Sequence, residues 1–348
     1  MTLSNTEIID HSDSIPFDEY NAKPIEAESI EEVKPKNIKP LTKREKALIK
    51  VGNDIQKANP KKASQLVYMH SIMCQIGLPR SAVEGKVFER VCGNAGMYIT
   101  AGALYNGTKF IPKPIPFGSY PRLVLAHLNT MALYQKSPVI NIKTSMAQFL
   151  KLIGKRASGG PKGTNTIFQE HISALAACNI SLGLTTEYSA ITYDGKPISR
   201  LEAFLPTDKS KSGNPQTITL SNEYYESLKS HAIPLDMRAL NALAPNSLAI
   251  DIYMMLADRL HRINGKHLIL HWKNLKDQFG QEYTGKNAPR DFKKSFKAAL
   301  RDALKVYPWA KVKEVKGGIL MIPSNPPVPF KPTKEDFSSD LPDNTGDQ

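Results

Sequence analysis

One segment near the carboxyl end constrains the fold most, because its apolar and basic residues separate onto opposite faces of a helix. Spacings of three and four place its apolar side chains in one stripe: Phe292, Phe296, Ala299, Leu300, Ala303 and Tyr307. The other stripe is cationic and holds Arg290, Lys294, Lys297, Arg301 and Lys305, with Lys293 at its edge. A helix of this kind packs by its apolar face and offers its basic face to a polyanion. The alternative is an ordinary solvated surface helix.

The charge of the whole chain favours the interpretation that the basic helix binds a polyanion. The net charge of +13 is spread unevenly over 348 residues, since residues 1–33 carry −8 and residues 333–348 carry −4, which leaves +25 on residues 34–332. A body this basic commonly binds nucleic acid or an anionic membrane. The acidic ends are polar and lack an apolar period, so we expect them to be disordered tails. They either screen the basic body or only aid solubility.

Composition excludes several other classes of protein. A hydrophobic content of 41% supports packed cores, and the length suits two domains plus tails. No stretch approaches the roughly 18–20 consecutive apolar residues of a membrane span, and the acidic amino-terminal segment is not a signal peptide. Cys74, Cys92 and Cys178 are odd in number and scattered, which argues against a disulfide framework and a thiolate metal site. We expect a cytoplasmic protein without metal or cofactor.

Two stretches of the chain share one order of predicted elements: helix, strand, helix, helix and hairpin. In the first stretch the elements are expected at 121–134, 139–142, 144–153 and 164–178, then at 180–187 and 189–204, with a hairpin-type turn at Asp194-Gly195. In the second stretch they are expected at 246–263, 267–271, 272–279 and 289–307, then at 310–315 and 318–323. This order is that of the winged-helix variant of the helix-turn-helix, whose third helix enters the major groove.

The predicted fold is therefore α+β and helix-rich, with two tandem winged-helix domains and disordered acidic tails. Its parts are a tail (1–40), an N-terminal winged-helix domain with preceding helices (41–232), a C-terminal winged-helix domain (233–330) and a second tail (331–348). The preceding helices are expected at 41–56 and 61–76, and a β-rich stretch follows at 88–105. Those helices serve dimerisation or simply cap the first core.

The two third helices differ in chemistry. The helix of the first stretch is polar, with Thr164, Asn165, Gln169 and Ser173 on one face, and its charges lie in the preceding loop as Lys155, Arg156 and Lys162. Amide side chains suit adenine, whereas the five cations of the second stretch suit phosphates, and Lys297 could reach guanine. The loop is rich in glycine and ends at a helix N-terminus, which suits a phosphate, although it lacks the P-loop spacing. The alternative is a flexible connection.

Several segments resemble the plasmid-encoded replication initiators of the RepA type, in order along residues 65–310. The segments that carry the resemblance are 75–80 (QIGLPR), 99–102 (ITAG), 116–123 (PFGSYPRL), 128–130 (LNT), 137–140 (SPVI), the loop 158–164 and 180–182 (ISL). The resemblance implies a protein that binds short repeats at a plasmid origin, helps to open the duplex, and brings in the host initiator and replicative helicase. It carries no residue roles to this chain.

Other functions compete with this one. A transcriptional repressor would use the same contacts to double-stranded DNA. A rolling-circle nickase would need metal-binding histidines and a tyrosine nucleophile, for which His267, His271 and the pair Tyr224-Tyr225 are the candidates. No catalytic or metal-ligand pattern stands out, so we expect no enzyme. The apolar stripe of the basic helix is too narrow for insertion into a membrane surface, which argues against a membrane-surface protein. The sequence does not decide between a monomer and a homodimer.

Overall fold

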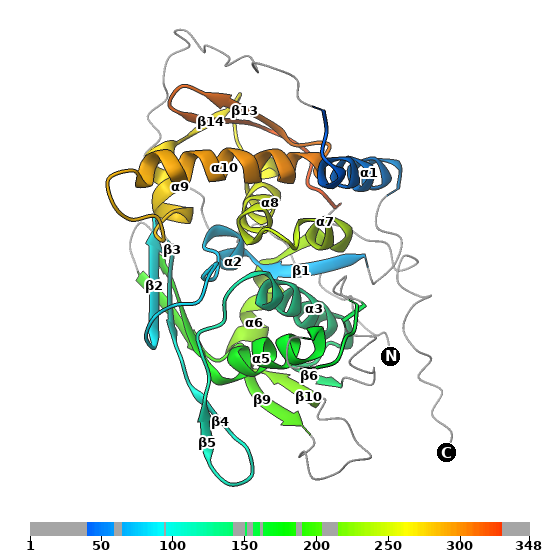
Figure 1. Cartoon of the computed structure of the whole chain (residues 1–348), viewed down its shortest axis with the longest axis vertical. Helices are drawn as coiled ribbons and strands as arrows, with labels where there is room; N and C mark the ends of the chain where they lie inside the picture. Colours follow the sequence, from blue (N-terminus) through cyan, green and yellow to red (C-terminus); the bar gives the residue numbers. More distant parts are fainter. Residues whose placement is uncertain are drawn as a thin grey trace, which may run out of the picture.

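The computed structural model describes residues 40–58, 65–93, 95–141, 150–151, 156–160, 163–185, 190–203 and 215–328, and the fold is α+β (Figure 1). Both predicted tails lie outside the described residues, apart from residue 40. So do Lys155 and Lys162 and most of the predicted helix 144–153, of which only Leu150 and Lys151 are described, as helical. No helix in the described part of the chain is long and apolar enough to cross a membrane.

The amino-terminal elements differ in part from the prediction. Helix α1 (Lys43–Lys57) is confirmed; it begins at a capping box in which Thr42 and Glu45 each accept from the other's backbone N–H. The helix predicted at 61–76 is wrong: the structure has strand β1 (Leu66–His70) followed by the short helix α2 (Ser71–Gln75). Strand β1 pairs with β11 (Ala232–Asp236), far along the chain, so a long-range contact decides its conformation.

The first predicted unit contains a three-stranded antiparallel sheet. Helix α3 (Ser119–Gln135) is followed by β6 (Val139–Asn141), α5 (Thr164–Ala177), β9 (Ile198–Ala203) and β10 (Pro215–Leu220). The strand order is β6-β10-β9, with Ile218 of β10 opposite Ile140 on one side and Leu201 on the other. The last strand along the chain therefore lies in the middle.

Another strand pair separates α5 from β9. Strands β7 (Asn179–Thr185) and β8 (Ala190–Gly195) join β2 (Val87–Cys92) and β3 (Ala95–Thr100) in a sheet ordered β2-β3-β7-β8. The β-rich stretch is thereby confirmed. The predicted hairpin across Asp194-Gly195 is wrong, because β8 and β9 on either side of this turn belong to different sheets. A small ribbon of β4 (Ala103–Tyr105) and β5 (Phe110–Pro112) precedes α3.

The second unit repeats the strand order of the first. After α6 (Asn222–His231), β11 and α7 (Met237–Leu243), its elements follow in sequence: α8 (Ser247–Arg259), the 3-10 helix η2 (Leu260–Arg262), β12 (Leu268–His271), α9 (Trp272–Phe279), α10 (Ala288–Lys305), β13 (Lys311–Val315) and β14 (Gly318–Ile322). Its sheet is ordered β12-β14-β13, again with the last strand in the middle. The helices and strands predicted here are confirmed.

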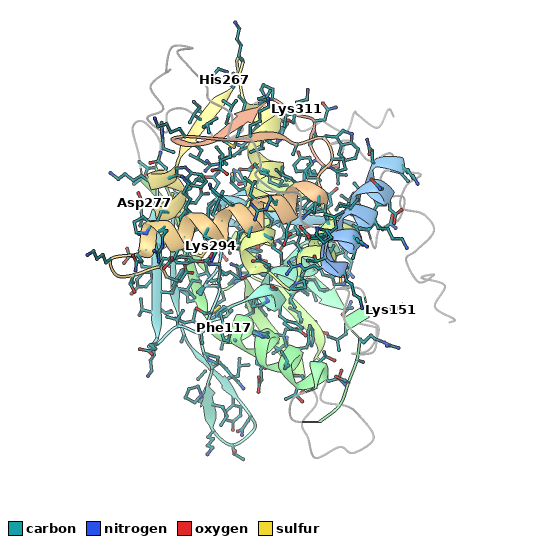
Figure 2. The ribbon with its side chains drawn as sticks, turned by 45° about the horizontal axis from the view of Figure 1, so that its top comes forward. Phe117, Lys151, His267, Asp277, Lys294 and Lys311 are labelled. Atoms are coloured by element: carbon teal, nitrogen blue, oxygen red, sulfur yellow. The ribbon has the colours of Figure 1, made fainter. Side chains whose placement is uncertain are left out.

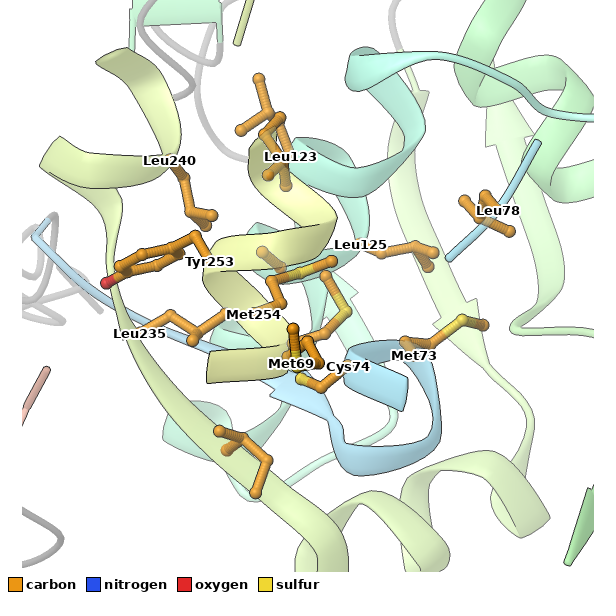
Figure 3. Close-up of a cluster of buried hydrophobic side chains, with 14 of the residues drawn as sticks. Met69, Met73, Cys74, Leu78, Leu123, Leu125, Leu235, Leu240, Tyr253 and Met254 are labelled. Atoms are coloured by element: carbon orange, nitrogen blue, oxygen red, sulfur yellow. The ribbon is translucent and has the colours of Figure 1, made fainter. Parts of the chain in front are cut away.

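A single hydrophobic cluster runs through both units. Figure 3 shows part of it, to which β1 contributes Met69, α2 contributes Met73, α3 contributes Leu123 and α8 contributes Met254. Helix α8 is buried from Leu248 to Arg259, so it is a central element rather than an edge. The predicted domain boundary at 232/233 falls at the first residues of β11, and the pairing of β11 with β1 joins the two sides. The boundaries stay a prediction.

A buried ion pair also joins the units. The Arg122 guanidinium of α3 donates from Nε to Oδ1 of Asp251 (2.6 Å) and from Nη2 to its Oδ2 (2.8 Å), and the two side chains are 2% and 1% exposed. Arg122 also donates to three backbone carbonyls, those of Leu78, Pro79 and Gly118. Its hydrogen-bonding capacity is therefore used across the contact between α3, the loop after α2, and α8.

A second arginine cluster flanks this pair. Nη2 of Arg90 lies 2.8 Å from Glu282, and Nη2 of Arg80 lies 2.9 Å from the same carboxylate. Burial alone would raise the pKa of Glu282, but the charges of Arg90 and Arg80 lower it overall. A Cβ at position 77 would lie 2.5 Å from the Asp251 carboxylate, so only glycine fits there without a shift of the neighbouring atoms. We call Arg80, Arg90, Arg122, Asp251 and Glu282 the inter-unit junction.

Candidate nucleic-acid interface

The strongly amphipathic helix predicted from sequence is α10. Phe292, Phe296, Ala299, Leu300 and Ala303 are all buried, and Pro289 stands in its first turn. The Phe296 ring packs edge-on against Trp272 at 5.8 Å and lies 6.0 Å from Phe279 of α9. This packing holds the apolar face against α8 and α9 and turns the basic face outward.

Three cations of the stripe are exposed. They are Arg290, Lys294 and Arg301, at spacings of four and seven residues. Figure 2 shows Lys294 on the side of α10 turned toward the viewer. Arg290 contacts the adjacent Asp291 at 3.2 Å, but both side chains are largely exposed, so this pair contributes little. These three residues, defined here as the open cations, can meet an external anion without breaking a buried contact.

Other predicted cations are engaged within the protein. Lys297 forms an ion pair with Glu314 of β13, and Nζ of Lys293 lies 4.7 Å from the Trp272 ring centroid. Nζ of Lys305 lies 2.9 Å from Glu45 of α1 and 3.7 Å from Asp302. The predicted file of five available cations is therefore corrected to three. The sequence pattern missed this because Glu314 and Glu45, which make the shorter ion pairs, lie outside the helix.

Helix α1 covers the carboxyl-terminal turn of α10. The two helices approach so closely that a Cβ on Gly52 would lie 1.9 Å from the carbonyl oxygen of Lys305. Arg44 adds an ion pair with Asp302 at 3.0 Å. The first half of α10, with Arg290 and Lys294, stays exposed. Arg301, in the second half, is exposed as well.

The β13–β14 hairpin adds positive charge beside α10. Lys311, Lys313 and Lys316 are exposed along it. Its turn is anchored to α9, because the backbone N–H of Trp272 donates to the carbonyl of Gly317 at 3.0 Å. Helix and hairpin thus present cations from one rigid unit.

The loop before α5 is folded onto the helix start. The Thr164 hydroxyl donates to the carbonyl of Arg156 at 2.5 Å and accepts from the N–H of Ser158 at 2.8 Å. The N–H of Thr164 donates to Ser158 Oγ, and that of Asn165 to the Ser158 carbonyl. The Thr164 hydroxyl is therefore engaged within the loop, and its predicted contact with a base stays a prediction. The same contacts occupy two of the amides that a phosphate at this helix start would need.

Three polar side chains of α5 remain candidates. Asn165, Gln169 and Ser173 are half-buried, and Oδ1 of Asn165 has no hydrogen-bond partner among the described residues. Arg156 is exposed in the loop. Exposed Glu170 lies beside Gln169 and would repel a phosphate. Helix α5 thus offers amide groups for hydrogen bonding but much less positive charge than α10.

The residues that a nickase would need are poorly placed. Tyr224 and Tyr225 of α6 are 8% and 7% exposed. Burial raises the pKa of Tyr224, whose hydroxyl donates to Asn129 at 3.1 Å, so its phenolate is disfavoured. His267 and His271 lie at β12, in the other unit. Within the described residues no group of three or more His, Cys, Asp or Glu side chains could hold a metal ion.

Residues 115–274 match the protein family described as "Plasmid encoded RepA protein". The RepA-type resemblance is thereby confirmed. The crystal structure of domains 2 and 3 of RctB is similar to this chain at 10% sequence identity and a TM-score of 0.47, covering 74% of this chain and 98% of that one. No curated protein matches the chain.

The RepA-type match begins just before α3 and ends within α9. It includes Arg122 and Asp251, the buried pair of the inter-unit junction, and it stops before α10. Gly77, Leu78 and Pro79, which carried part of the resemblance in sequence, contact the same junction. The buried Arg122–Asp251 pair thus lies inside the matched segment, whereas the open cations lie outside it.

Gln169 gives a direct test of base reading in the RepA-type segment. Replacing Gln169 by alanine is expected to weaken binding to the cognate site by about 1–3 kcal/mol and to change binding to random DNA much less, because only a base contact depends on sequence. Fluorescence anisotropy with both DNAs measures the difference. Glu170→Ala on the same helix is the matched control and should not weaken binding. Equal losses on the two DNAs would show that Gln169 only positions the backbone.

Proposed function

We propose that this chain is a sequence-specific DNA-binding plasmid replication initiator that binds repeats at the origin, helps to open the duplex and recruits the host initiator and replicative helicase. The match to the plasmid-encoded RepA family supports the replication role. The observation that carries DNA binding is the exposed basic half of α10, next to a hairpin that is itself basic. Because its proposed ligand, plasmid DNA, is replicated in the cytoplasm, we expect the protein to act there.

Both units are assigned as winged helices. In each, a helix and a strand come before the candidate recognition helix and two strands of one sheet come after it, although β7 and β8 come between in the first unit. The strand orders β6-β10-β9 and β12-β14-β13 are equivalent. The recognition helices are then α5 and α10, and the wings are β9–β10 and β13–β14. The repeat of topology without repeat of sequence supports the assignment, since a chance match of one unit would not recur in the other.

The two units divide the work of DNA binding. Arg290, Lys294 and Arg301 neutralise phosphates and release counterions, which supplies affinity that does not depend on sequence. Asn165 and Gln169 of α5 hydrogen-bond to base edges, which supplies specificity. Because the inter-unit junction fixes the two helices relative to each other, the site on DNA has two blocks at a set separation. A pair of protein copies would bind two such sites.

Plasmid maintenance tests the proposal. A plasmid that carries the DNA flanking this gene, but no other origin active in the host, is expected to persist only when the full chain is supplied. Footprinting on the same DNA should show protected repeats. A protein that protects a promoter but never maintains the plasmid would be a repressor, and magnesium-dependent nicking of the supercoiled origin would indicate a nickase.

A further inference from the structure

The β4–β5 ribbon displays two aromatic rings at its tip. Tyr105 and Phe110 form its last cross-strand pair, with ring centroids 5.4 Å apart. They are 60% and 70% exposed, the largest values for large hydrophobic side chains in the part of the chain that the structure describes. The ribbon extends at the lower end of the molecule in Figure 1, where β4 and β5 project beyond the neighbouring sheets. Two adjacent exposed rings form an apolar patch, and a contiguous exposed patch of this kind marks an interaction site.

The tip is held in one conformation. Asn106 Oδ1 accepts hydrogen bonds from the N–H of Thr108 (3.1 Å) and of Lys109 (2.9 Å). The Tyr105 hydroxyl donates to the carbonyl of Gly107 at 2.8 Å, and Gly107 has a φ of 98°, which favours glycine. The rings are therefore displayed by an ordered turn, so a ligand need not supply the free energy of ordering it.

The base of the ribbon is fixed to the first unit. Leu104 packs against the hydrophobic core, and a Cβ on Gly102 would lie 2.0 Å from the carbonyl oxygen of Ala177, the last residue of α5. The ribbon thus starts at the carboxyl end of the candidate recognition helix. DNA bound along α5 would continue toward the two rings.

The charge of the ribbon indicates the ligand. Residues 101–114 contain Lys109 and Lys113 and no aspartate or glutamate. Rings flanked by cations suit nucleic acid, since bases stack on aromatic faces and lysines neutralise phosphates. In an intact duplex the base faces are covered by their neighbours, so a stacking surface of this kind favours unpaired bases.

We propose that the Tyr105–Phe110 pair binds single-stranded DNA by stacking on unpaired bases, with Lys109 and Lys113 on the flanking phosphates. The proposal rests on the proposed function, because duplex opening at an origin is what supplies an unpaired strand beside α5. It assigns to the ribbon the capture of one separated strand, while α5 and α10 hold the adjacent duplex.

Anisotropy titrations of the full chain with a fluorescent oligothymidine test the ribbon, and a duplex of the flanking DNA serves as the second probe. The Tyr105→Ala, Phe110→Ala variant is expected to bind the oligothymidine at least about tenfold more weakly, since each stacked base contributes roughly 5- to 150-fold. Its affinity for the duplex should change less than about twofold, well below the effect of losing a stacked base. Phe110→Tyr keeps both rings and the hydroxyl of Tyr105, and should bind as the natural chain does.

Two controls separate stacking from other causes. Tyr98→Ala removes an exposed ring from β3, outside the ribbon, and should leave binding of the single strand unchanged. Phe110→Leu keeps an apolar side chain without a ring, so full binding by this variant would overturn stacking and indicate an apolar docking site. The proposal also fails if the double alanine variant binds the oligothymidine normally, or loses both probes equally. If the natural chain binds the duplex but not the oligothymidine, the proposed role of the ribbon is refuted while the proposed function stands. If it binds neither probe, the proposed function itself is refuted.

Discussion

Replacing Arg290, Lys294 and Arg301 together by alanine is expected to weaken DNA binding by about 100- to 1,000-fold at 0.1 M salt, while folding is unaffected. The three side chains are exposed on one stripe of α10, so their removal leaves no buried partner unpaired. Each phosphate contact releases a counterion, and the plot of log K against log salt should become shallower by about 0.9 per contact, or about 2.7 in all. Titrations at several salt concentrations measure the slope.

A matched variant controls for net charge. Lys46, Lys50 and Lys57 are exposed on the side of α1 opposite Leu48, Gly52 and Ile55, which pack inward. Replacing these three lysines removes the same charge from a surface turned away from α10 and should change affinity by less than about tenfold, since exposed charges beyond a Debye length are screened. A loss as large as that of the α10 variant would show that the overall field, and not the open cations, binds DNA.

The amphipathic helix α10 could be predicted because its determinants are local. Apolar positions at helical spacing and Pro289 in the first turn are visible in the sequence, and the structure has α10 from Ala288 to Lys305. Which cations stay available could not be predicted, because Glu45 and Glu314 come to Lys305 and Lys297 through tertiary packing. The hydrogen bonds of Thr164 within the loop could not be predicted for the same reason, since only the folded loop brings Ser158 to the Thr164 hydroxyl.

The errors in the fold have a common cause. Strand β1 is buried on both faces, so its sequence lacks the alternation that distinguishes a strand from a buried helix. Its partner β11 comes more than 160 residues later. At Asp194-Gly195 the dipeptide favours a tight hairpin, but β8 continues a sheet begun by β2 and β3, and β9 pairs with β10. In both places long-range strand pairing overrides the local preference.

Arg122→Ala is expected to destabilise the protein by about 3–5 kcal/mol, because it leaves the Asp251 carboxylate buried without its counter-charge. Three backbone carbonyls, those of Leu78, Pro79 and Gly118, would lose a donor at the same time. A loss of this size is a large part of the 5–15 kcal/mol that is typical of folded proteins. Urea denaturation followed by circular dichroism measures the free energy of unfolding. Arg44→Ala, which removes an exposed partner of Asp302, is the control and should cost at most about 1 kcal/mol.

The double replacement Arg122→Met, Asp251→Leu separates charge pairing from the role of the carbonyls. Apolar side chains often replace a buried ion pair without loss, because the desolvation of both charges is avoided. Here the methionine cannot donate to the three carbonyls, so the part of the loss that comes from leaving them without a donor should persist. The double variant is therefore expected to be more stable than Arg122→Ala and less stable than the natural chain. Full stability of the double variant would show that the guanidinium serves only Asp251, and that the loop from Gly77 to Pro79 does not depend on it.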